Sequence, residues 1–379
     1  MNKQEKLAIL KDMINIDSTN GNEEEVADYL LKQFAKYGIL SEKVAYSEAR
    51  TNLVSKIGGK NGKVLGFSGH MDVVDAGDRK AWKTPPFQAT ESDGKLFGRG
   101  STDMKSGLAA MVIAMIELEQ EGKLIDGQIK LLATIGEEIG EIGAAQLTTL
   151  GYADDLDGLI IGEPSVRQII YAHKGSMNYT LVSYGKNAHS STPELGINAI
   201  DNLMLFYKEV EQYVAGIHQT NDILGVFTHN VTVIEGGNQV NSIPARAQLQ
   251  GNIRTIPEVD NEKTEQVFCT IVSKLNKQEG VHLEITWDYN KMPVFSDPKS
   301  NLVKIAESIA KEQFGKTIPI IGLAGTTDAA EFIKAKNQFP LIIFGPGNNT
   351  PHEVNEYVDI ENYLEMIDVY KAIAIQFLK

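Results

Sequence analysis

Apolar segments that end in a histidine or a carboxylate recur along this chain, and this pattern constrains its fold more than any other feature. The first of them, Val64 to Phe67, leads into a turn that carries His70 and Asp72. Three later segments repeat it: IKLLATI at 129–135 precedes Glu137 and Glu138, LII at 159–161 precedes Glu163, and LIIF at 341–344 leads through GPGNNTP to His352. Ligand-binding residues collect beyond the carboxyl ends of the strands in an open, mostly parallel α/β sheet. The sequence therefore predicts such a sheet, flanked by helices, with these side chains at one edge.

A further carboxylate, Asp103, lies at the start of a helix. Gly98, Gly100 and two hydroxyl residues break the chain before it, and the apolar run GLAAMVIAMIELE at 107–119 follows it. A residue at such a junction points its side chain away from the helix into open space. We therefore expect Asp103 to join the residues that follow the strands.

The length and charge of the chain favour a protein that acts on small molecules. With 379 residues, 42% of them hydrophobic, it is long enough for two domains with cores of their own. A net charge of −14 repels nucleic acid and anionic membranes, so we expect neither as a partner. No apolar run is long enough to span a membrane and no leader-like segment stands at the start, which favours a cytoplasmic location.

The single cysteine, Cys269, is consistent with that location. One cysteine excludes an internal disulfide framework and suits a reducing cytosol. Cys269 lies inside the helical pattern TEQVFCTIVSKL. We therefore expect a buried, small apolar residue there and not a nucleophile.

The alternation of strands and helices is interrupted once, by the segment 176–288. Its pattern is strand, helix, strand, strand, helix, strand, which is the βαββαβ order of a ferredoxin-like domain, and it contains none of the site residues named above. The earlier pattern resumes with LIIF and His352. We therefore predict a discontinuous domain, 1–175 and 289–379, that carries the site, and a second domain, 176–288, inserted into it.

Two divalent cations can be held by five of these residues if one carboxylate bridges them: His70, Asp103, Glu138, Glu163 and His352. Asp103 is the natural bridge. Two imidazoles with three carboxylates suit Zn²⁺ and tolerate Mn²⁺ or Co²⁺, whereas Ca²⁺ requires oxygen ligands alone. Asp72 is placed to accept the second N–H of His70. Glu137 is not needed as a ligand, so it is the candidate general base for a water that the cations activate.

Each of these residues has an ordinary structural interpretation when it is seen alone. A pair of glutamates is most often a solvated helix start. A lone histidine is most often a surface or core residue, which is our interpretation of His173, His218 and His229. The convergence of several segments on the same chemistry favours a metal site over these alternatives.

Five motifs make the chain similar to a known family: SGHMDVV, GRGSTDMKSG, GEEIG, GEPS and GPGNNTPHEVNEYV. Over nearly its whole length it resembles the zinc aminoacylase and carboxypeptidase superfamily. The resemblance implies a zinc-peptidase-like catalytic domain with a co-catalytic dinuclear site. In that site His70 and Glu163 would hold one ion, Glu138 and His352 the other, with Asp103 bridging, Glu137 as the base, Asp72 behind His70, and a cis peptide between Asp103 and Met104.

The resemblance also implies roles for the inserted domain, which is a lid and dimerisation domain in this superfamily, so we expect a homodimer. His189 in GKNAHSSTPELG matches a histidine that reaches a neighbouring active site and stabilises the oxyanion. Arg254, Asn241 and Thr326 match residues that hold the substrate carboxylate, and a guanidinium can bind a carboxylate with two parallel hydrogen bonds. Without the resemblance, Arg254 would also suit a surface ion pair.

The activity that the resemblance implies is metal-dependent removal of an acyl group from an N-acyl amino acid with a free carboxylate. The superfamily includes succinyl-diaminopimelate desuccinylases and acetylornithine deacetylases, which act in lysine and diaminopimelate or in arginine biosynthesis, and these are the types we expect. A dipeptidase or carboxypeptidase of the same superfamily is the alternative, because the motifs do not separate them. A non-catalytic binding module would have lost a ligand or the base, and none is missing here.

Overall fold

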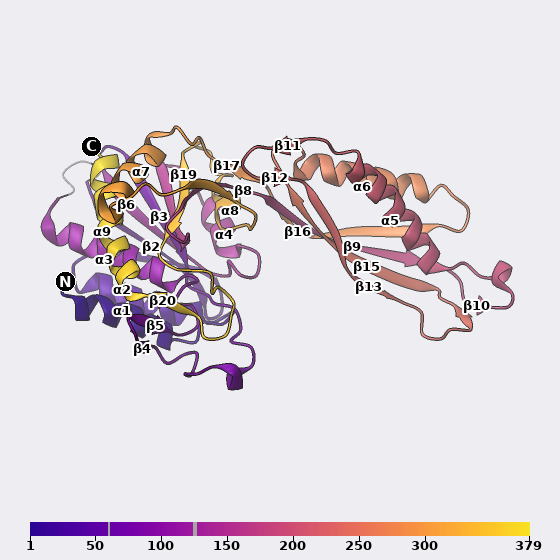
Figure 1. Ribbon diagram of the computed structural model, residues 1–379, viewed down its shortest axis with the longest axis horizontal. Coiled ribbons are helices and arrows are strands. Elements are labelled where there is room, and N and C mark those ends of the chain that lie inside the picture. The colour runs from indigo at the N-terminus through magenta and orange to yellow at the C-terminus, as the bar shows by residue number, and fades with distance from the viewer. Residues whose placement is uncertain (60, 124–126) are drawn as a thin grey trace. The chain divides into compact units, whose positions relative to one another are not determined.

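The computed structural model describes residues 1–59, 61–123 and 127–379, which form two compact units (Figure 1). The first unit comprises Met1–Tyr171, Ser296–Ile321 and Thr327–Lys379, and the second comprises Ala172–Phe295 and Gly322–Thr326. The segment 176–288, which the sequence pattern marks as an insertion, lies inside the second unit. Each unit has its own sheet and its own helices.

A mixed sheet forms the centre of the first unit, in the order β1-β2-β6-β3-β7-β19-β8. Its strands are β1 (Ser41–Ser47), β2 (Arg50–Gly58), β3 (Val64–His70), β6 (Gln128–Thr134), β7 (Gly158–Pro164), β8 (Ile169–His173) and β19 (Leu341–Gly345). Four neighbouring strands pair in parallel, β6 with β3, β3 with β7 and β7 with β19, and these four are buried along almost their whole length. The outer strands are antiparallel, and β8 also pairs with β17 (Val294–Phe295) and β18 (Ile320–Leu323).

Helices flank this sheet: α1 (Lys3–Asn15), α2 (Glu23–Ala35), α3 (Lys105–Glu121), α4 (Ile142–Thr149), α7 (Asn301–Phe314), α8 (Ala329–Phe332) and α9 (Ile360–Phe377). The central one is α3, which is buried from Lys105 to Leu118, as a helix that is apolar all round should be. It packs against α9, α1 and the strands β3 and β7. Within the described ranges, no helix is long and apolar enough to cross a membrane.

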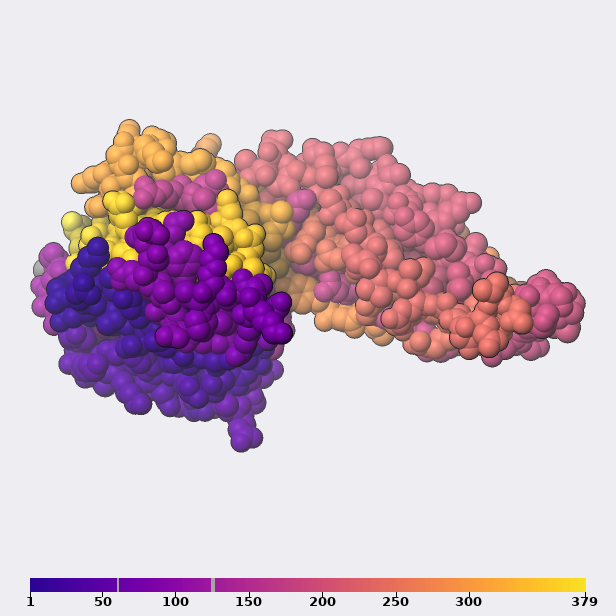
Figure 2. Space-filling model, turned by 60° about the horizontal axis from the view of Figure 1, so that its bottom comes forward, coloured from indigo at the N-terminus to yellow at the C-terminus, as the bar shows by residue number. Residues whose placement is uncertain are grey.

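The first and last helices lie side by side on the surface of the first unit, as Figure 2 shows for the indigo and yellow segments. There the hydroxyl of Tyr363 on α9 donates to the carbonyl of Lys6 on α1, at 2.9 Å. On α3 beneath them, Glu117 forms ion pairs with Lys6 and Lys371, both at 2.9 Å. These contacts tie three helices that are far apart in the sequence.

Three glycines let the end of β7 fit closely between α3 and β19. A Cβ atom on Gly107 would lie 1.9 Å from the carbonyl oxygen of Gly162, and one on Gly345 would lie 2.1 Å from the same oxygen. Both distances are too short for atoms that are not bonded to each other, so a larger residue at either position would push α3 or β19 away from β7. Asp103 precedes α3 and Glu163 follows Gly162, so this close approach sets the spacing of two predicted metal ligands.

An antiparallel sheet with α5 (Ala199–Ala215) and α6 (Asn261–Leu275) on one face forms the second unit (Figure 1). Its strands, in the order β13-β15-β9-β16, are β13 (Thr228–Gly236), β15 (Arg246–Thr255), β9 (Gly175–Tyr184) and β16 (His282–Lys291). The predicted ferredoxin-like βαββαβ arrangement is therefore confirmed. Tyr179, Phe206 and Phe268 meet edge to face in its core. Short ribbons pair β10 (Ala188–His189) with β14 (Ser242–Ile243), and β11 (Thr220–Asn221) with β12 (Gly225–Val226).

Cys269 lies on α6, as predicted, but the prediction that it is buried was wrong, because it is exposed. The buried stripe of α6 includes Phe268, Val272 and Leu275. Successive residues of a helix are about 100° apart, so the residue after Phe268 falls outside this stripe. The helical period was recognised, but its phase was assigned incorrectly.

Candidate metal centre

The parallel strands bring several polar side chains to one edge of the central sheet. β3 ends at His70, the turn after β6 carries Glu137 and Glu138, and Glu163 is the next-to-last residue of β7. His352 lies in the loop that follows β19. Because these strands are parallel neighbours, their carboxyl ends face the same way. The side chains at these ends therefore meet.

Asp103 reaches the same edge from a different direction. It follows a small antiparallel sheet made of β4 (Thr90–Ser92), β5 (Lys95–Phe97) and β20 (Tyr357–Asp359), and it precedes α3. The peptide bond between Asp103 and Met104 is cis, as the resemblance implies. A loop, and not a strand of the central sheet, therefore presents the Asp103 carboxylate.

The two oxygens of the Asp103 carboxylate face different histidines. Nε2 of His70 lies 3.1 Å from Oδ1 of Asp103 and 3.4 Å from Oε1 of Glu163. Nε2 of His352 lies 3.4 Å from Oδ2 of Asp103 and 3.0 Å from Oε1 of Glu138. Asp103 therefore stands between two groups, each of which has one histidine and one further carboxylate.

Asp72 has different partners from those we predicted. We expected its carboxylate to accept the second N–H of His70, but Nδ1 of His70 lies 2.9 Å from the backbone carbonyl of Asp72 and 3.6 Å from the carboxylate. The carboxylate instead accepts the backbone N–H groups of Glu137 (3.2 Å) and Glu138 (3.1 Å). The carbonyl fixes the ring proton on Nδ1, so the Nε2 lone pair of His70 faces Asp103 and Glu163.

Burial and crowding shift the pKa values of this cluster. Burial alone would lower the pKa of His70, but the surrounding carboxylates of Glu163, Asp103 and Asp72 outweigh it and raise that pKa. Burial, with the charge of Glu163, raises the pKa of Glu137 well above its usual range. Hydrogen bonds to Asp103 and Glu138 raise the pKa of His352 to about 10. The cluster thus has a surplus of negative charge that cations would neutralise.

The donor set fits divalent cations. His70, Asp103 and Glu163 form one group and Asp103, Glu138 and His352 form another, and within each group the candidate ligand atoms lie within 4.8 Å of one another. One imidazole with two carboxylates suits zinc and metals of similar hardness. A third group, His70, Glu137 and Glu138, meets the same limit. Only the first two together use all five predicted ligands, and they share Asp103.

His189 lies on β10 and Asn241 directly precedes β14, so the two lie at the same end of this ribbon of the second unit. There the backbone N–H of Ser190 donates to the carbonyl of Asn241 at 3.0 Å. The His189 side chain is exposed. Its Nδ1 atom accepts the backbone N–H of Ser191 (3.2 Å) and lies 2.7 Å from the Ser191 hydroxyl. Because Nδ1 is an acceptor, the ring proton of neutral His189 is on Nε2, which can donate to an anion.

Arg254 lies half-buried on β15, and no carboxylate of the described part of the chain forms an ion pair with it. The described residues therefore do not form the surface ion pair that was the alternative interpretation of Arg254. Burial, with a smaller contribution from the charge of Arg254, lowers the pKa of His173 to about 4, and the same two causes lower the pKa of Lys174. Thr326 belongs to the same unit, and its hydroxyl lies 3.2 Å from that of Tyr289.

Three buried charged residues near the site were not singled out from the sequence. Arg99 and Glu356 form an ion pair at 2.6 Å, with Glu356 hydrogen-bonded to the backbone of Asp103. Asp328 accepts the hydroxyl of Thr134 at 2.6 Å, and burial raises its pKa to about 7. Arg99 and Glu356 do lie within two of the quoted motifs, but nothing in their spacing separates them from surface charges.

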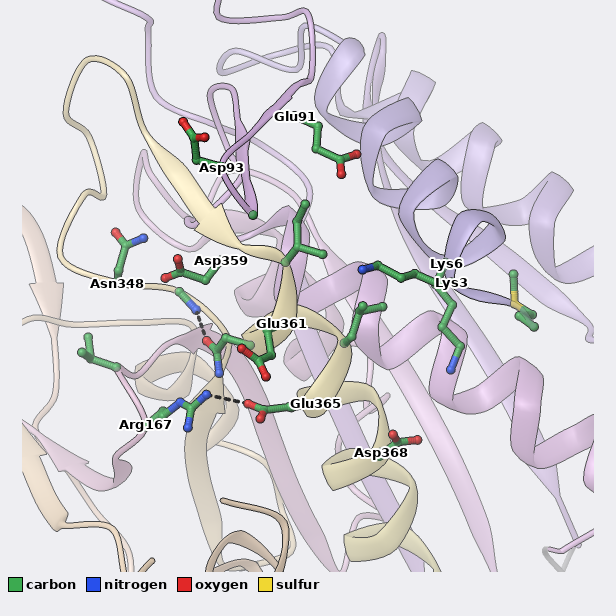
Figure 3. A pocket seen from close by; sticks show the side chains of 17 residues that line it. Lys3, Lys6, Glu91, Asp93, Arg167, Asn348, Asp359, Glu361, Glu365 and Asp368 are labelled. Carbon is green, nitrogen blue, oxygen red and sulfur yellow. Dashed lines mark hydrogen bonds and ion pairs between the residues drawn. The ribbon is translucent and has the colours of Figure 1, made fainter. Parts of the chain in front are cut away.

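A hollow of about 1000 Å³ lies beside the start of α9 (Figure 3). Acidic side chains such as Asp359, Glu361 and Asp368 line it, and Arg167 pairs there with Glu365 at 2.6 Å. None of the predicted ligands or catalytic residues is among the residues that line it. This hollow is therefore no part of the candidate metal centre.

Comparisons with known proteins agree on the family to which the chain is similar. The family model described as peptidase family M20/M25/M40 matches residues 66–376. A probable succinyl-diaminopimelate desuccinylase of Staphylococcus aureus (strain MRSA252) is 40% identical over 100% of this chain and 98% of its own length. A succinyl-diaminopimelate desuccinylase of Psychromonas ingrahamii is 31% identical over 96% of each chain. Among solved structures, a family M20 metallo-carboxypeptidase from Sulfolobus solfataricus has a TM-score of 0.82 at 23% identity, over 99% of both chains.

Proposed function

The chain belongs to peptidase family M20/M25/M40, and from this premise we propose that it removes the succinyl group from N-succinyl-diaminopimelate in the cytoplasm. As a member of the family it is a metal-dependent hydrolase that cleaves amide bonds. The observation that carries the finer proposal is that two relatives named for this reaction match 100% and 96% of the chain, at 40% and 31% identity. Two other reactions are the alternatives to this proposal: the deacetylation of acetylornithine and the hydrolysis of peptides.

The cofactor we propose is a pair of divalent ions, zinc by preference, with cobalt or manganese as substitutes. His70 and Glu163 would bind one ion, and Glu138 and His352 would bind the other. Asp103 would bind both ions. The support is that each Asp103 oxygen faces a different histidine. When bound, such ions polarise an amide carbonyl and acidify water, so that water can attack at neutral pH.

Glu137 is the proposed general base. In its carboxylate form, a glutamate with a raised pKa is a stronger base than an exposed one, and Glu137 is adjacent to Glu138 without being needed as a ligand. It takes a proton from the attacking water and gives it to the nitrogen of the breaking amide bond. The products are then succinate and the free amine, and Glu137 returns to its starting state. The Asp72 carboxylate holds the backbone from which Glu137 projects.

His189 is the proposed donor to the oxyanion that forms on the amide carbonyl. Two contacts from Ser191 direct its proton to Nε2, so the exposed edge of the ring carries an N–H. A donor aimed at developing negative charge contributes about 2.7–4 kcal/mol to a comparable transition state. Asn241 lies at the end of the same ribbon, and we propose that it contacts the bound substrate.

The substrate carboxylate is the proposed partner of Arg254. A half-buried guanidinium without a carboxylate partner among the described residues is expected to bind an anion from solution. Lys174 adds a second positive charge near it, in a chain whose net charge is −14. A substrate with several carboxylates suits this region, and we propose that Thr326 contributes its hydroxyl to the same contact.

His189 and Arg254 lie at opposite ends of β9 in the second unit, and the length of that strand exceeds what one small molecule can span. Arg254 on β15 lies opposite Ser176, near the start of β9, whereas His189 comes after β9 has ended at Tyr184. The strand from Ser176 to Tyr184 spans about 26 Å at about 3.3 Å per residue. If both residues act on one substrate, they therefore come from different chains, which supports a homodimer with shared active sites.

An exposed strand supplies a surface for that dimer. β13 forms an edge of its sheet, and its residues Val233 and Ile234 are 38% and 56% exposed. Met204 and Tyr207, three residues apart on α5, are also exposed, and α5 packs beside β13. An open edge strand with apolar side chains can pair with the same strand of a second copy around a two-fold axis. We propose that the second unit dimerises in this way.

An amine-release assay tests the proposal. Purified protein loaded with Zn²⁺ or Co²⁺ is given N-succinyl-diaminopimelate, acetylornithine and a set of dipeptides at pH 7, with Glu137→Gln as the control for contaminating hydrolases. We expect kcat/KM for the succinylated substrate to exceed that for the others by about tenfold or more, because its additional carboxylate can reach a cationic group. A dipeptide or acetylornithine turned over faster would replace the proposed substrate.

A further inference from the structure

A buried carboxylate lies directly behind the loop that carries Asp103. Glu356 has no exposed surface. Its oxygens accept from four donors of that loop: the backbone N–H groups of Gly100 (2.9 Å), Thr102 (2.7 Å) and Asp103 (2.9 Å), and Nη1 of Arg99 (2.6 Å). Each oxygen takes two of these hydrogen bonds, which fills its acceptor positions. Glu356 therefore acts on Asp103 through the backbone and is not itself placed to bind a cation.

Arg99 extends the same connection to His352. Its side chain is 2% exposed, and its guanidinium lies over the ring of Trp82. Its Nη atoms donate to three further backbone carbonyls: those of His352 (3.4 Å), Glu353 (3.3 Å) and Asp75 (3.3 Å). One buried ion pair thus joins the Asp103 loop to the His352 loop and to the segment that follows Asp72.

We propose that Glu356 and Arg99 are positioning residues that hold the Asp103 and His352 loops at the spacing that the metal ions require. The inference rests on the metal centre of the proposed function, but not on the identity of the substrate. Moving either loop would leave buried N–H groups or a buried charge without a partner, which is costly. The ion pair therefore keeps Asp103 and His352 in place whether or not the ions are bound.

The expected effect of losing this ion pair is weaker binding of both ions. Asp103 belongs to both ligand groups, and Glu356 holds the backbone N–H of Asp103 itself. Groups that orient metal ligands from behind typically contribute a factor of about 10–100 to metal affinity. A purely structural ion pair would instead affect unfolding without changing metal affinity.

The test compares metal binding by three proteins: wild type, Glu356→Gln, and Glu361→Gln as the control. Glutamine has nearly the shape of glutamate, but its NH₂ group would face backbone donors. Glu361 is exposed and lies on α9 just after the same segment, so its variant has the same change in charge. Titration of metal-free protein with Zn²⁺ against a competing chelator gives the dissociation constants. We expect an increase of about 10–100-fold for Glu356→Gln and less than about twofold for Glu361→Gln.

The outcomes separate the inference from the proposed function. If wild type binds two ions per chain and Glu356→Gln binds both with unchanged dissociation constants, the positioning role is overturned while the metal centre stands. If wild type binds no divalent ion, the metal centre fails, and the positioning role fails with it. Weaker binding by Glu356→Gln alone supports the inference.

Arg99→Lys provides a second test should Glu356→Gln fail to fold. Lysine retains the charge but lacks the planar fork of two nitrogens with which Arg99 donates to Glu356 and to the backbone carbonyls. Thermal unfolding is measured without metal and at a fixed Zn²⁺ concentration, because the metal-dependent rise in Tm reports affinity. We expect that rise to be smaller in Arg99→Lys than in wild type. A lower Tm without metal, combined with an unchanged metal-dependent rise, would assign the ion pair a structural role only and overturn the inference.

Discussion

The carboxylate of Asp72 accepts the backbone N–H of Glu137, with 3.2 Å between the nitrogen and Oδ1. Its second oxygen accepts the N–H of Glu138, and the Asp72 side chain has no exposed surface. The turn after β6 is therefore fixed by a residue that lies two positions after His70. This arrangement holds the proposed base and one proposed ligand side by side, with their side chains free to serve different roles.

Glu137→Gln should keep the metal ions and lose most of the activity. Glutamine cannot take a proton from water, but the backbone hydrogen bond to Asp72 and the ligands remain as they are. We expect kcat to fall by at least about 10²-fold, the lower range for removal of a general base. Metal content by atomic emission and kcat are measured on the same preparation. If Glu137→Gln loses an ion or turns over at near the wild-type rate, Glu137 is not the base.

The sequence predicted the strand ends well, because the buried parallel strands are largely apolar and glycines mark where they end. β3, β6, β7 and β19 could be recognised from this contrast alone. The partners of buried polar groups could not be predicted from the sequence. The carboxylate of Asp72 holds the backbone 65 residues later, and Glu356 holds that of Asp103 from 253 residues away. Such pairs depend on how loops meet in space, and no local period or spacing encodes them.

Gly107→Ala should disturb the spacing of the metal ligands. The added methyl group would lie 1.9 Å from the carbonyl oxygen of Gly162, so α3 and β7 must separate. Overpacking of this kind destabilises by about 1–3 kcal/mol. We expect a lower free energy of unfolding in denaturant, together with weaker Zn²⁺ binding, since Asp103 and Glu163 lie next to this contact. Gly122→Ala is the control: a Cβ there meets open space, and although the left-handed backbone at φ 59° makes alanine destabilising, this change should not weaken Zn²⁺ binding. Equal effects of both changes on Zn²⁺ binding would contradict the close-approach argument.

Glu117 should stabilise the metal-free protein above about pH 4.5 and stop doing so in acid. Burial alone would raise its pKa, but hydrogen bonds from Lys371 and Lys6 outweigh it and lower the pKa from 4.5 to about 2. A carboxyl group with a lowered folded-state pKa stabilises the fold above its unfolded-state pKa, and this contribution is lost as the pH falls towards the folded value. The free energy of unfolding of wild type minus that of Glu117→Gln should therefore shrink between pH 5 and pH 3.

Denaturant unfolding at several pH values checks this expectation. Glu119→Gln, an exposed position on the same helix, is the control and should show a small difference from wild type throughout. EDTA is included so that loss of metal in acid does not contribute. A Glu117→Gln difference that stays constant, or that grows in acid, would contradict the assignment.

Active-site sharing between two chains can be tested by mixing inactive variants. Glu137→Ala lacks the proposed base, and His189→Ala lacks the proposed oxyanion donor, whose removal costs about 10²-fold or more. In a mixed dimer with sharing, the chain that retains Glu137 receives His189 from its partner. One of the two sites is then complete, and the other lacks both residues.

Co-refolding the two variants at equal concentration therefore gives a quantitative expectation. Random pairing makes half the dimers mixed, and each mixed dimer has one working site, so about a quarter of wild-type activity should return if the sites are independent. Activity is measured as amine release after the mixture is refolded, with each variant refolded alone as the control. If His189 serves the metal centre of its own chain, no mixed dimer contains a complete site, and activity remains at the level of the single variants. The separation of His189 from Arg254 along β9 leads us to expect recovery, provided that both residues act on one substrate as proposed.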